Sequence, residues 1–126
     1  MDVRLKRAYE PADTVDGRRV LIDRLWPRGV SREQARLDEW ARELSPSTEL
    51  REWFGHDPTR FAEFRRRYTI ELAAQKPKLR ELRRRARQGT LTLVYAAGDT
   101  EHNDAVVLAE VLRRGIRTSS AEETNS

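Results

Sequence analysis

The chain of 126 residues contains no cysteine and no long apolar run. Without cysteine, disulfides, thiolate metal sites and cysteine nucleophiles are excluded. No stretch approaches the roughly 18 apolar residues of a membrane span, and the amino terminus lacks the pattern of a secretory signal. We therefore expect a cytoplasmic protein with no membrane partner.

Lysine is scarce as well, with only Lys6, Lys76 and Lys78 among 25 basic residues. The net charge is +4, because 21 acidic residues oppose them. So strong an arginine bias is explained by genomic base composition as well as by phosphate recognition. The charge therefore supports anionic partners only weakly.

The length suits one domain with a single core. We predict one α/β domain over residues 1–116 and a frayed tail over 117–126, which is rich in Ser, Thr and Glu. Strands are expected over 2–9, 20–22 and 90–97, the last apolar on both faces and therefore central. The turn-rich linker after the first strand, with Asp16-Gly17 suited to positive φ, is too short for a helical crossover. The first two strands are thus antiparallel neighbours or separated within the sheet.

Helix start and stop signals predict four to five helices. A capping box of Ser31 and Gln34, followed by Leu37, Trp40 and Leu44 at helical spacing, predicts a helix over 31–44. A second helix is expected from the start signal at 45–48 to Gly55, and a third from Pro58 through Leu72 to the break at Lys76-Pro77. The last two are expected from that break through Leu79, Leu82 and Ala86 to near Gly89, and over 101–114. These elements indicate a small three-layer-like domain with a short, mainly parallel or mixed sheet of about three strands.

Charged residues and a tryptophan follow the strand over 20–22. They are Asp23, Arg24, Trp26 and Arg28, with Pro27 between the last two. Open α/β sheets bind ligands at the carboxyl ends of their strands. The alternative is structural, with Asp23 and Arg24 as an ion pair and Trp26 in the core.

A second polar run, Asp99 to Asp104, follows the strand over 90–97. Two buried strands joined by a long helical segment should be parallel, so both polar ends emerge at one edge of the sheet. We therefore expect one cleft formed by both runs.

The side chains of this cleft suit acid/base chemistry on an anionic ligand. The candidate catalytic residues are Asp23, Asp99, Glu101 and His102, and the candidate ligand-binding residues are Arg7, Arg24, Trp26, Arg28 and Asn103. Each has a structural alternative: Asp99 as a helix cap, Glu101 as a dipole partner, His102 as a surface residue.

Metal and nucleotide motifs are missing. The only histidines, His56 and His102, lack zinc-site spacing, so we predict no metal and no cofactor, although a divalent ion between Asp23 and Asp99 stays an open alternative. No glycine-rich phosphate loop or serine-hydrolase motif occurs.

Two arginine clusters, 65–67 and 83–85, fall on expected helices. Glu63 with Arg67 and Glu81 with Arg85 have the spacing of intrahelical ion pairs, which favours a solvated surface. Consecutive arginines also point to different sides of a helix. Nucleic acid is nevertheless kept as an alternative partner.

Several segments together resemble the YeaO-like family, domain of unknown function 488. They are Asp16-Gly17 with 20–29, Asp38-Glu39-Trp40, 45–50, and 91–97 with Glu101-His102-Asn103. The resemblance implies a small cytoplasmic α/β protein whose activity is not established. Gly98 departs from the family, where a basic residue is expected, which implies that an anion contact is weakened or replaced here.

The leading hypothesis is therefore a cleft that binds an anionic or nucleotide-like ligand and performs acid/base chemistry such as hydrolysis. The alternatives are a non-catalytic nucleic-acid-binding module that uses the arginine-rich helices, and a regulatory protein that binds a ligand without turnover. The oligomeric state is left open.

Overall fold

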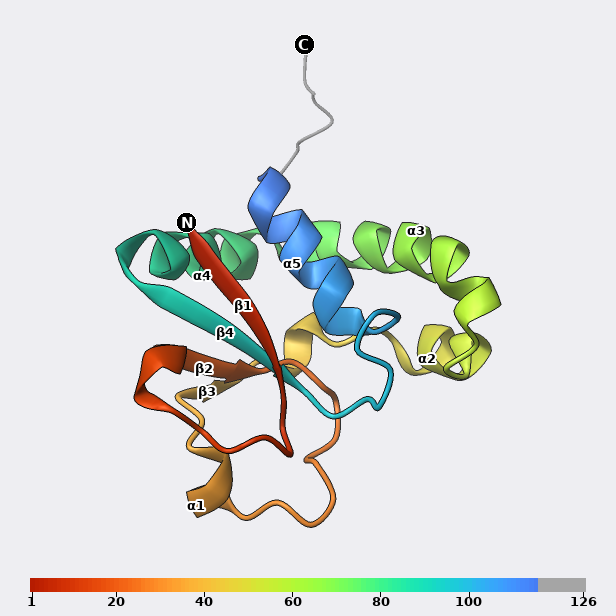
Figure 1. The fold of residues 1–126 in the computed structure, drawn as a ribbon. Coiled ribbons are helices and arrows are strands. Elements are labelled where there is room, and N and C mark those ends of the chain that lie inside the picture. The colour runs from red at the N-terminus through yellow and green to blue at the C-terminus, as the bar shows by residue number, and fades with distance from the viewer. Residues whose placement is uncertain (116–126) are drawn as a thin grey trace, which may run out of the picture.

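The computed structural model, which describes residues 1–115, contains a sheet of four parallel strands in the order β1-β4-β2-β3 (Figure 1). The strands are β1 (Asp2–Arg7), β2 (Arg18–Leu21), β3 (Glu39–Trp40) and β4 (Thr90–Tyr95). The predicted α/β class is confirmed, with β4 central. The expected tail over 117–126 lies outside the described residues.

The α-helices are α1 (Arg32–Ala35), α2 (Thr48–Phe54), α3 (Phe61–Leu72), α4 (Lys76–Gln88) and α5 (Asp104–Arg114). Apolar residues of α2 to α5 pack on one face of the sheet. On the other face, Ala8, Leu21 and Val94 are covered by Trp26 and Trp40, on the side where Figure 1 shows α1 and its loops. The sheet is therefore the middle of three layers.

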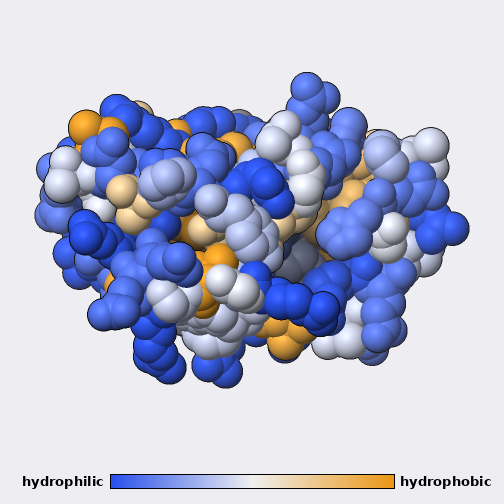
Figure 2. Space-filling model, turned by 60° about the horizontal axis from the view of Figure 1, so that its bottom comes forward, coloured by the Kyte–Doolittle hydropathy of each residue, from blue (hydrophilic) through white to orange (hydrophobic). Residues whose placement is uncertain are grey.

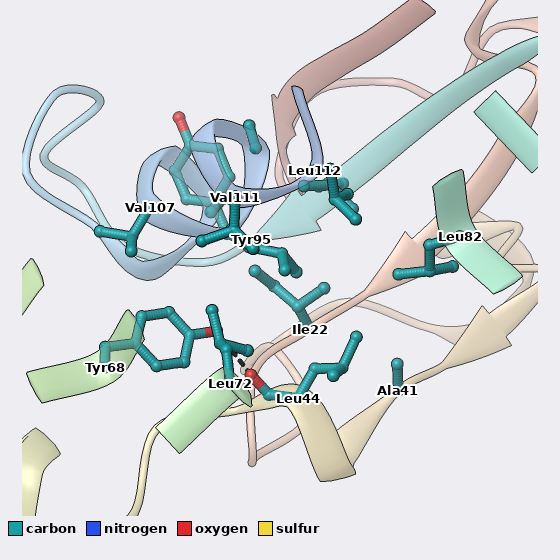
Figure 3. Close-up of a cluster of buried hydrophobic side chains, with 14 of the residues drawn as sticks. Ile22, Ala41, Leu44, Tyr68, Leu72, Leu82, Tyr95, Val107, Val111 and Leu112 are labelled. Carbon is teal, nitrogen blue, oxygen red and sulfur yellow. Dashed lines mark hydrogen bonds between the residues drawn. The ribbon is translucent and has the colours of Figure 1, made fainter. Parts of the chain in front are cut away.

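The main core lies between the sheet and the longer helices (Figure 3). Ile22 is fully buried just after β2, and it lies near Tyr95 at the end of β4. The Tyr68 hydroxyl from α3 donates a hydrogen bond to the carbonyl oxygen of Leu44 at 2.5 Å. This bond satisfies a hydroxyl that would be costly to bury alone, and it ties α3 to the segment before α2.

The predicted helix over 31–44 is wrong beyond residue 35. The capping box of Ser31 and Gln34 forms, but Arg36 adopts a left-handed conformation with φ 46° and ends α1. Trp40 then pairs with Leu21 in the sheet. Pairing with a distant strand outweighed the local helical spacing, as tertiary context often does.

Two further expectations are resolved by the topology. Of the two arrangements left open for the first strands, separation is correct, because β4 lies between β1 and β2. The last helix begins at Asp104 instead of residue 101, because the Asn103 side chain accepts the N–H of Val106 and forms the N-cap. Residues 98–103 are thus a loop, which leaves their polar groups at the sheet edge.

Gly17 marks the tight turn into β2, where φ is 63° as the Asp16-Gly17 pair predicted. A Cβ at this position would lie 2.3 Å from the backbone oxygen of Thr90. We expect Gly17→Ala to lower the free energy of unfolding by about 3 kcal/mol, since it combines a backbone clash with a left-handed alanine. Denaturant unfolding measures this loss.

Gly29→Ala is the matched control. Gly29 also has positive φ, 80°, but a Cβ there meets nothing within 4 Å. Its cost should be limited to about 1 kcal/mol from the left-handed backbone. Equal losses in the two variants would show that the approach to Thr90 is unimportant.

Candidate functional site

A cleft of about 480 Å³ opens at the carboxyl ends of β2 and β4, beside α2 and the start of α5. Both polar runs line it, through residues 23–28 and through 96–99 with Asn103 and Asp104. The structure thus brings the two sequence segments together at one edge. Figure 2 turns the lower side of Figure 1 forward, and there apolar residues appear in recesses between hydrophilic ones.

Asp23 connects the two strand ends. Its Oδ2 accepts the backbone N–H of Ala96 at 2.8 Å, one position beyond β4. Its own carbonyl oxygen accepts the indole N–H of Trp40 at 2.7 Å. Asp23 is therefore held by both neighbours of β2, and its carboxyl group has a fixed position at the cleft wall.

Asp23 is paired with a second carboxyl group, that of Asp104 at the first turn of α5. Burial, reinforced by the charge of Asp23, raises the pKa of Asp104 well above its usual range. Burial also raises the pKa of Asp23, although a hydrogen bond from Asp104 and the Ala96 N–H oppose that rise. Burial and mutual repulsion therefore favour a single negative charge on the pair, with Asp104 the harder of the two to ionise.

Three arginines line the same cleft: Arg24, Arg28 and Arg51. All three are exposed, and within residues 1–115 none of them forms an ion pair. Arg24 is oriented by one hydrogen bond, from Nη2 to the Pro46 carbonyl oxygen at 3.2 Å. A guanidinium group without an ion-pair partner can bind two oxygens of one carboxylate or phosphate group.

The other candidate catalytic residues belong to the loop after β4. Asp99 lines the cleft, but Glu101 and His102 do not. The Asp99 carboxylate accepts the N–H groups of Glu101 and His102 at 2.9 and 3.0 Å, and these bonds hold its pKa below the ordinary range. His102 Nδ1 lies 2.9 Å from Asp99, and its ring packs edge-on against Phe61. This cluster shapes the loop between β4 and α5.

The remaining candidates for ligand binding make internal contacts. Arg7 does not line the cleft, and its Nε donates to the Ala97 carbonyl oxygen at 2.9 Å, which braces the end of β4. Asn103 lines the cleft but its side chain caps α5 and donates to the Asp99 carbonyl oxygen. Trp26 presents part of its ring to the cleft, while its Nε1 donates to the Val30 carbonyl oxygen at 2.6 Å.

Sequence reasoning missed three residues of this cleft: Asp104, Arg51 and His56. Asp104 ends the polar run after β4, so its place in that run was a usable signal. Arg51 and His56 come from α2 and the turn after it, and no local motif distinguishes them. Only the packing of α2 against the core brings them to the sheet edge.

Comparison with known proteins supports the resemblance found in the sequence. The family described as "Inactive DUF488-N3 subclade" matches residues 2–126. The uncharacterized protein YeaO of Escherichia coli (strain K12) is 45% identical over 113 residues, which cover 90% of this chain and 98% of that protein. The chain belongs to the YeaO-like DUF488 family.

Two mycobacterial proteins are similar to the chain at almost the same level of identity. The uncharacterized proteins Mb3100c of Mycobacterium bovis and Rv3073c of Mycobacterium tuberculosis are each 43% identical over 110 residues, covering 87% of this chain and 92% of theirs. No solved structure matches the chain. Family membership thus establishes kinship over nearly the whole chain, and these relatives are themselves uncharacterized.

The described part of this DUF488 chain offers neither a metal cluster nor a membrane-spanning helix. Over residues 1–115, no three His, Asp or Glu side chains are grouped so that they could hold a metal ion. Over the same residues, each helix is too short or too polar to cross a membrane.

The raised pKa of Asp104 predicts a change in stability. A carboxyl group whose pKa is higher in the folded state favours folding at low pH, and that contribution is lost as the pH rises through the folded pKa. Asparagine has the shape of aspartic acid and an N–H donor in place of the acid O–H. We expect Asp104→Asn to raise the free energy of unfolding at pH 7 by about 1 kcal/mol. The gain over wild type should grow between pH 4 and 7, as measured by urea unfolding.

Asp99→Asn is the matched control, since its pKa is lowered by backbone N–H donors. Removing that charge should decrease stability at pH 7. The paired-carboxyl description would be contradicted if both variants lost stability to the same extent.

Proposed function

We propose that this DUF488 protein binds a small anionic, nucleotide-like ligand in the cleft at the ends of β2 and β4 and does not turn it over. The observation that carries the proposal is the set of three arginines without ion-pair partners in residues 1–115, gathered around one cleft. The cytoplasmic location inferred from the sequence stays a prediction.

The charge balance of the cleft supports an anion. Because burial and mutual repulsion favour a single negative charge on the Asp23–Asp104 pair, that pair and Asp99 together supply two negative charges. The three arginines outnumber these two charges. A site with both carboxyl groups ionised would repel an anion much more strongly, because like charges at short range interact strongly away from water.

The apolar part of the cleft supports a ligand that also carries a ring or another flat apolar group. Phe54 and Phe64 stack with their centroids 4.4 Å apart and line the inner wall, whereas Leu25 is 66% exposed at the rim. Ligand pockets commonly combine such apolar walls with a few polar groups that fix orientation. Nucleotides have both parts.

Binding without turnover is supported by the position of two of the four proposed acid/base residues. Glu101 and His102 do not line the cleft, and His102 is held by Asp99 in the neighbouring loop. The matching subclade is itself described as inactive, which agrees with this proposal.

Hydrolysis is the second candidate function, and the Asp23–Asp104 pair favours it. Two carboxyl groups that share a proton can act as a general acid and a general base, as coupled carboxyl pairs do in some hydrolases. Release of phosphate from adenosine monophosphate by wild type, abolished in Asp104→Asn, would establish hydrolysis in place of binding alone.

Arg51→Ala tests the binding proposal. Arg51 is exposed and forms no ion pair in the described residues, so the substitution should leave stability almost unchanged. We expect wild type to bind adenosine monophosphate and Arg51→Ala to bind it about tenfold more weakly, the usual effect of removing one charge-assisted hydrogen bond. Isothermal titration calorimetry measures both affinities.

Arg66→Ala provides the control, because Arg66 lies on α3 and pairs with Glu63 at 2.8 Å. Its affinity for adenosine monophosphate should equal that of wild type. Absence of binding of both adenosine monophosphate and inorganic phosphate by wild type at millimolar concentration would sink the proposal.

The alternative partner, nucleic acid, is supported by a row of arginines on α4 and not by the arginines of α3. On α3, Arg66 and Arg67 both bind Glu63, and these bonds lower the pKa of Glu63 to about 2. On α4, the exposed residues Arg80, Arg84 and Arg87 have i, i+4, i+7 spacing and no ion-pair partner in residues 1–115. They share one side of the helix.

If that row binds nucleic acid, replacing all three α4 arginines by alanine should weaken binding to a duplex DNA oligonucleotide. The slope of log affinity against log salt should also fall by about one unit for each phosphate that the variant no longer neutralises. Fluorescence anisotropy over a salt series measures both, with Arg51→Ala as the variant that leaves this binding intact. A wild-type protein that fails to bind the oligonucleotide at low salt would eliminate this alternative.

A further inference from the structure

His56 has a backbone conformation that is uncommon in residues other than glycine. Its φ is 57°, and the preceding Gly55, which caps α2, has φ 53°. Among residues 1–115, Arg36 is the other non-glycine residue with positive φ. Left-handed backbone is unfavourable for any residue with a Cβ, and such residues cluster at functional sites.

The turn that contains His56 cannot relax easily, because both neighbours have capping roles. The Gly55 N–H donates to the Arg51 carbonyl oxygen and closes α2. The Asp57 side chain accepts the Thr59 N–H at 3.0 Å and begins the next helical turn. Only one residue separates the two caps, so the backbone of His56 is dictated by the helices on either side.

Nothing in this turn requires a histidine side chain. Glycine would adopt the same backbone with less strain. Within the described residues the imidazole forms no ion pair and no hydrogen bond, and its nearest aromatic neighbour is the Phe54 ring, at a centroid distance of 6.2 Å. A polar side chain that is kept in an unfavourable backbone conformation and lacks an internal partner is suited to a contact outside the chain.

The imidazole does have a place in the cleft. His56, in the turn after α2, lines it together with Arg51 of α2 and with Asp23 from the end of β2. Phe54 and Phe64, stacked beneath this turn, fix its position on the core. The end of α2 thus presents a guanidinium and an imidazole to one cavity, a combination that can donate several hydrogen bonds to the oxygens of a single anion.

We propose that His56 is a ligand-binding residue, and that its ring contacts the phosphate-type group of the ligand beside Arg51. The inference rests on the proposed function and adds the ligand class, a phosphate ester with several acceptor oxygens. Arg24 and Arg28 face the ligand from the loop after β2, while His56 and Arg51 face it from α2. Binding then explains why a histidine, and not a glycine, occupies this turn.

His56→Gly separates binding from folding. The variant relieves the left-handed strain, so its thermal midpoint should equal that of wild type or rise by up to about 4 °C. Its affinity for adenosine monophosphate should nevertheless fall about tenfold, because a hydrogen bond to a charged group is removed. Affinity is measured by calorimetry and the thermal midpoint by circular dichroism.

Arg36→Gly is the matched control, since Arg36 also has positive φ, is exposed and does not line the cleft. It should show the same effect on the thermal midpoint with no change in affinity. His56→Asn serves as a second variant, because asparagine tolerates left-handed backbone but its side chain is shorter than that of histidine. It too should bind more weakly.

The outcomes are distinguishable. If wild type binds adenosine monophosphate and a folded His56→Gly or His56→Asn binds it equally well, the role of His56 is overturned and the proposed function stands. If wild type binds neither adenosine monophosphate nor inorganic phosphate, the proposed function itself fails. A weaker affinity that occurs only with a lowered thermal midpoint in both variants assigns His56 a structural role and also overturns the inference.

Discussion

The hydrogen bond from the Ala96 N–H to Asp23 Oδ2 is the interaction on which the cleft depends. It joins the chain just after β2 to the chain just after β4, where regular pairing of the strands has ended. It also holds the partly buried Asp23 beside Asp104. The charge state of the cleft follows from this position, because burial disfavours two ionised carboxyl groups at short distance.

That charge state makes the arginines of the cleft available to a ligand. On α3, the arginines are neutralised by Glu63 and Glu110, as is usual for a solvated helix surface. In the cleft, Arg24, Arg28 and Arg51 form no ion pair within residues 1–115, and the charge of Arg51 acts on Asp23 without direct ion-pair contact. A cleft with free cations and a partly neutralised acid pair is adapted to an anion that supplies the missing negative charge.

The fold was largely predictable, since strong local signals coincide with final elements. The apolar run of β4, the capping box at Ser31 and the glycine after α2 all appear where expected. The segment 36–44 was mispredicted because Leu37, Trp40 and Leu44 have helical spacing by coincidence. Leu37 and Trp40 pack on one face of the sheet and Leu44 on the other, a separation that only the pairing of β3 with β2 creates.

The sequence by itself determined which side chains are available at the edge of the sheet, since Asp23, Arg24, Arg28 and Asp99 follow buried strands that had to be parallel. The absence of cysteine excluded thiolate metal sites and cysteine nucleophiles. Tertiary structure decided which of these groups meet. It placed Asp104 against Asp23, added Arg51 and His56 from α2, and left His102 beside Phe61 outside the cleft. The reason is physical: the positions of most strands and helices follow from local pattern, whereas strand order and the contacts between a helix end and a distant strand end depend on how the whole core packs.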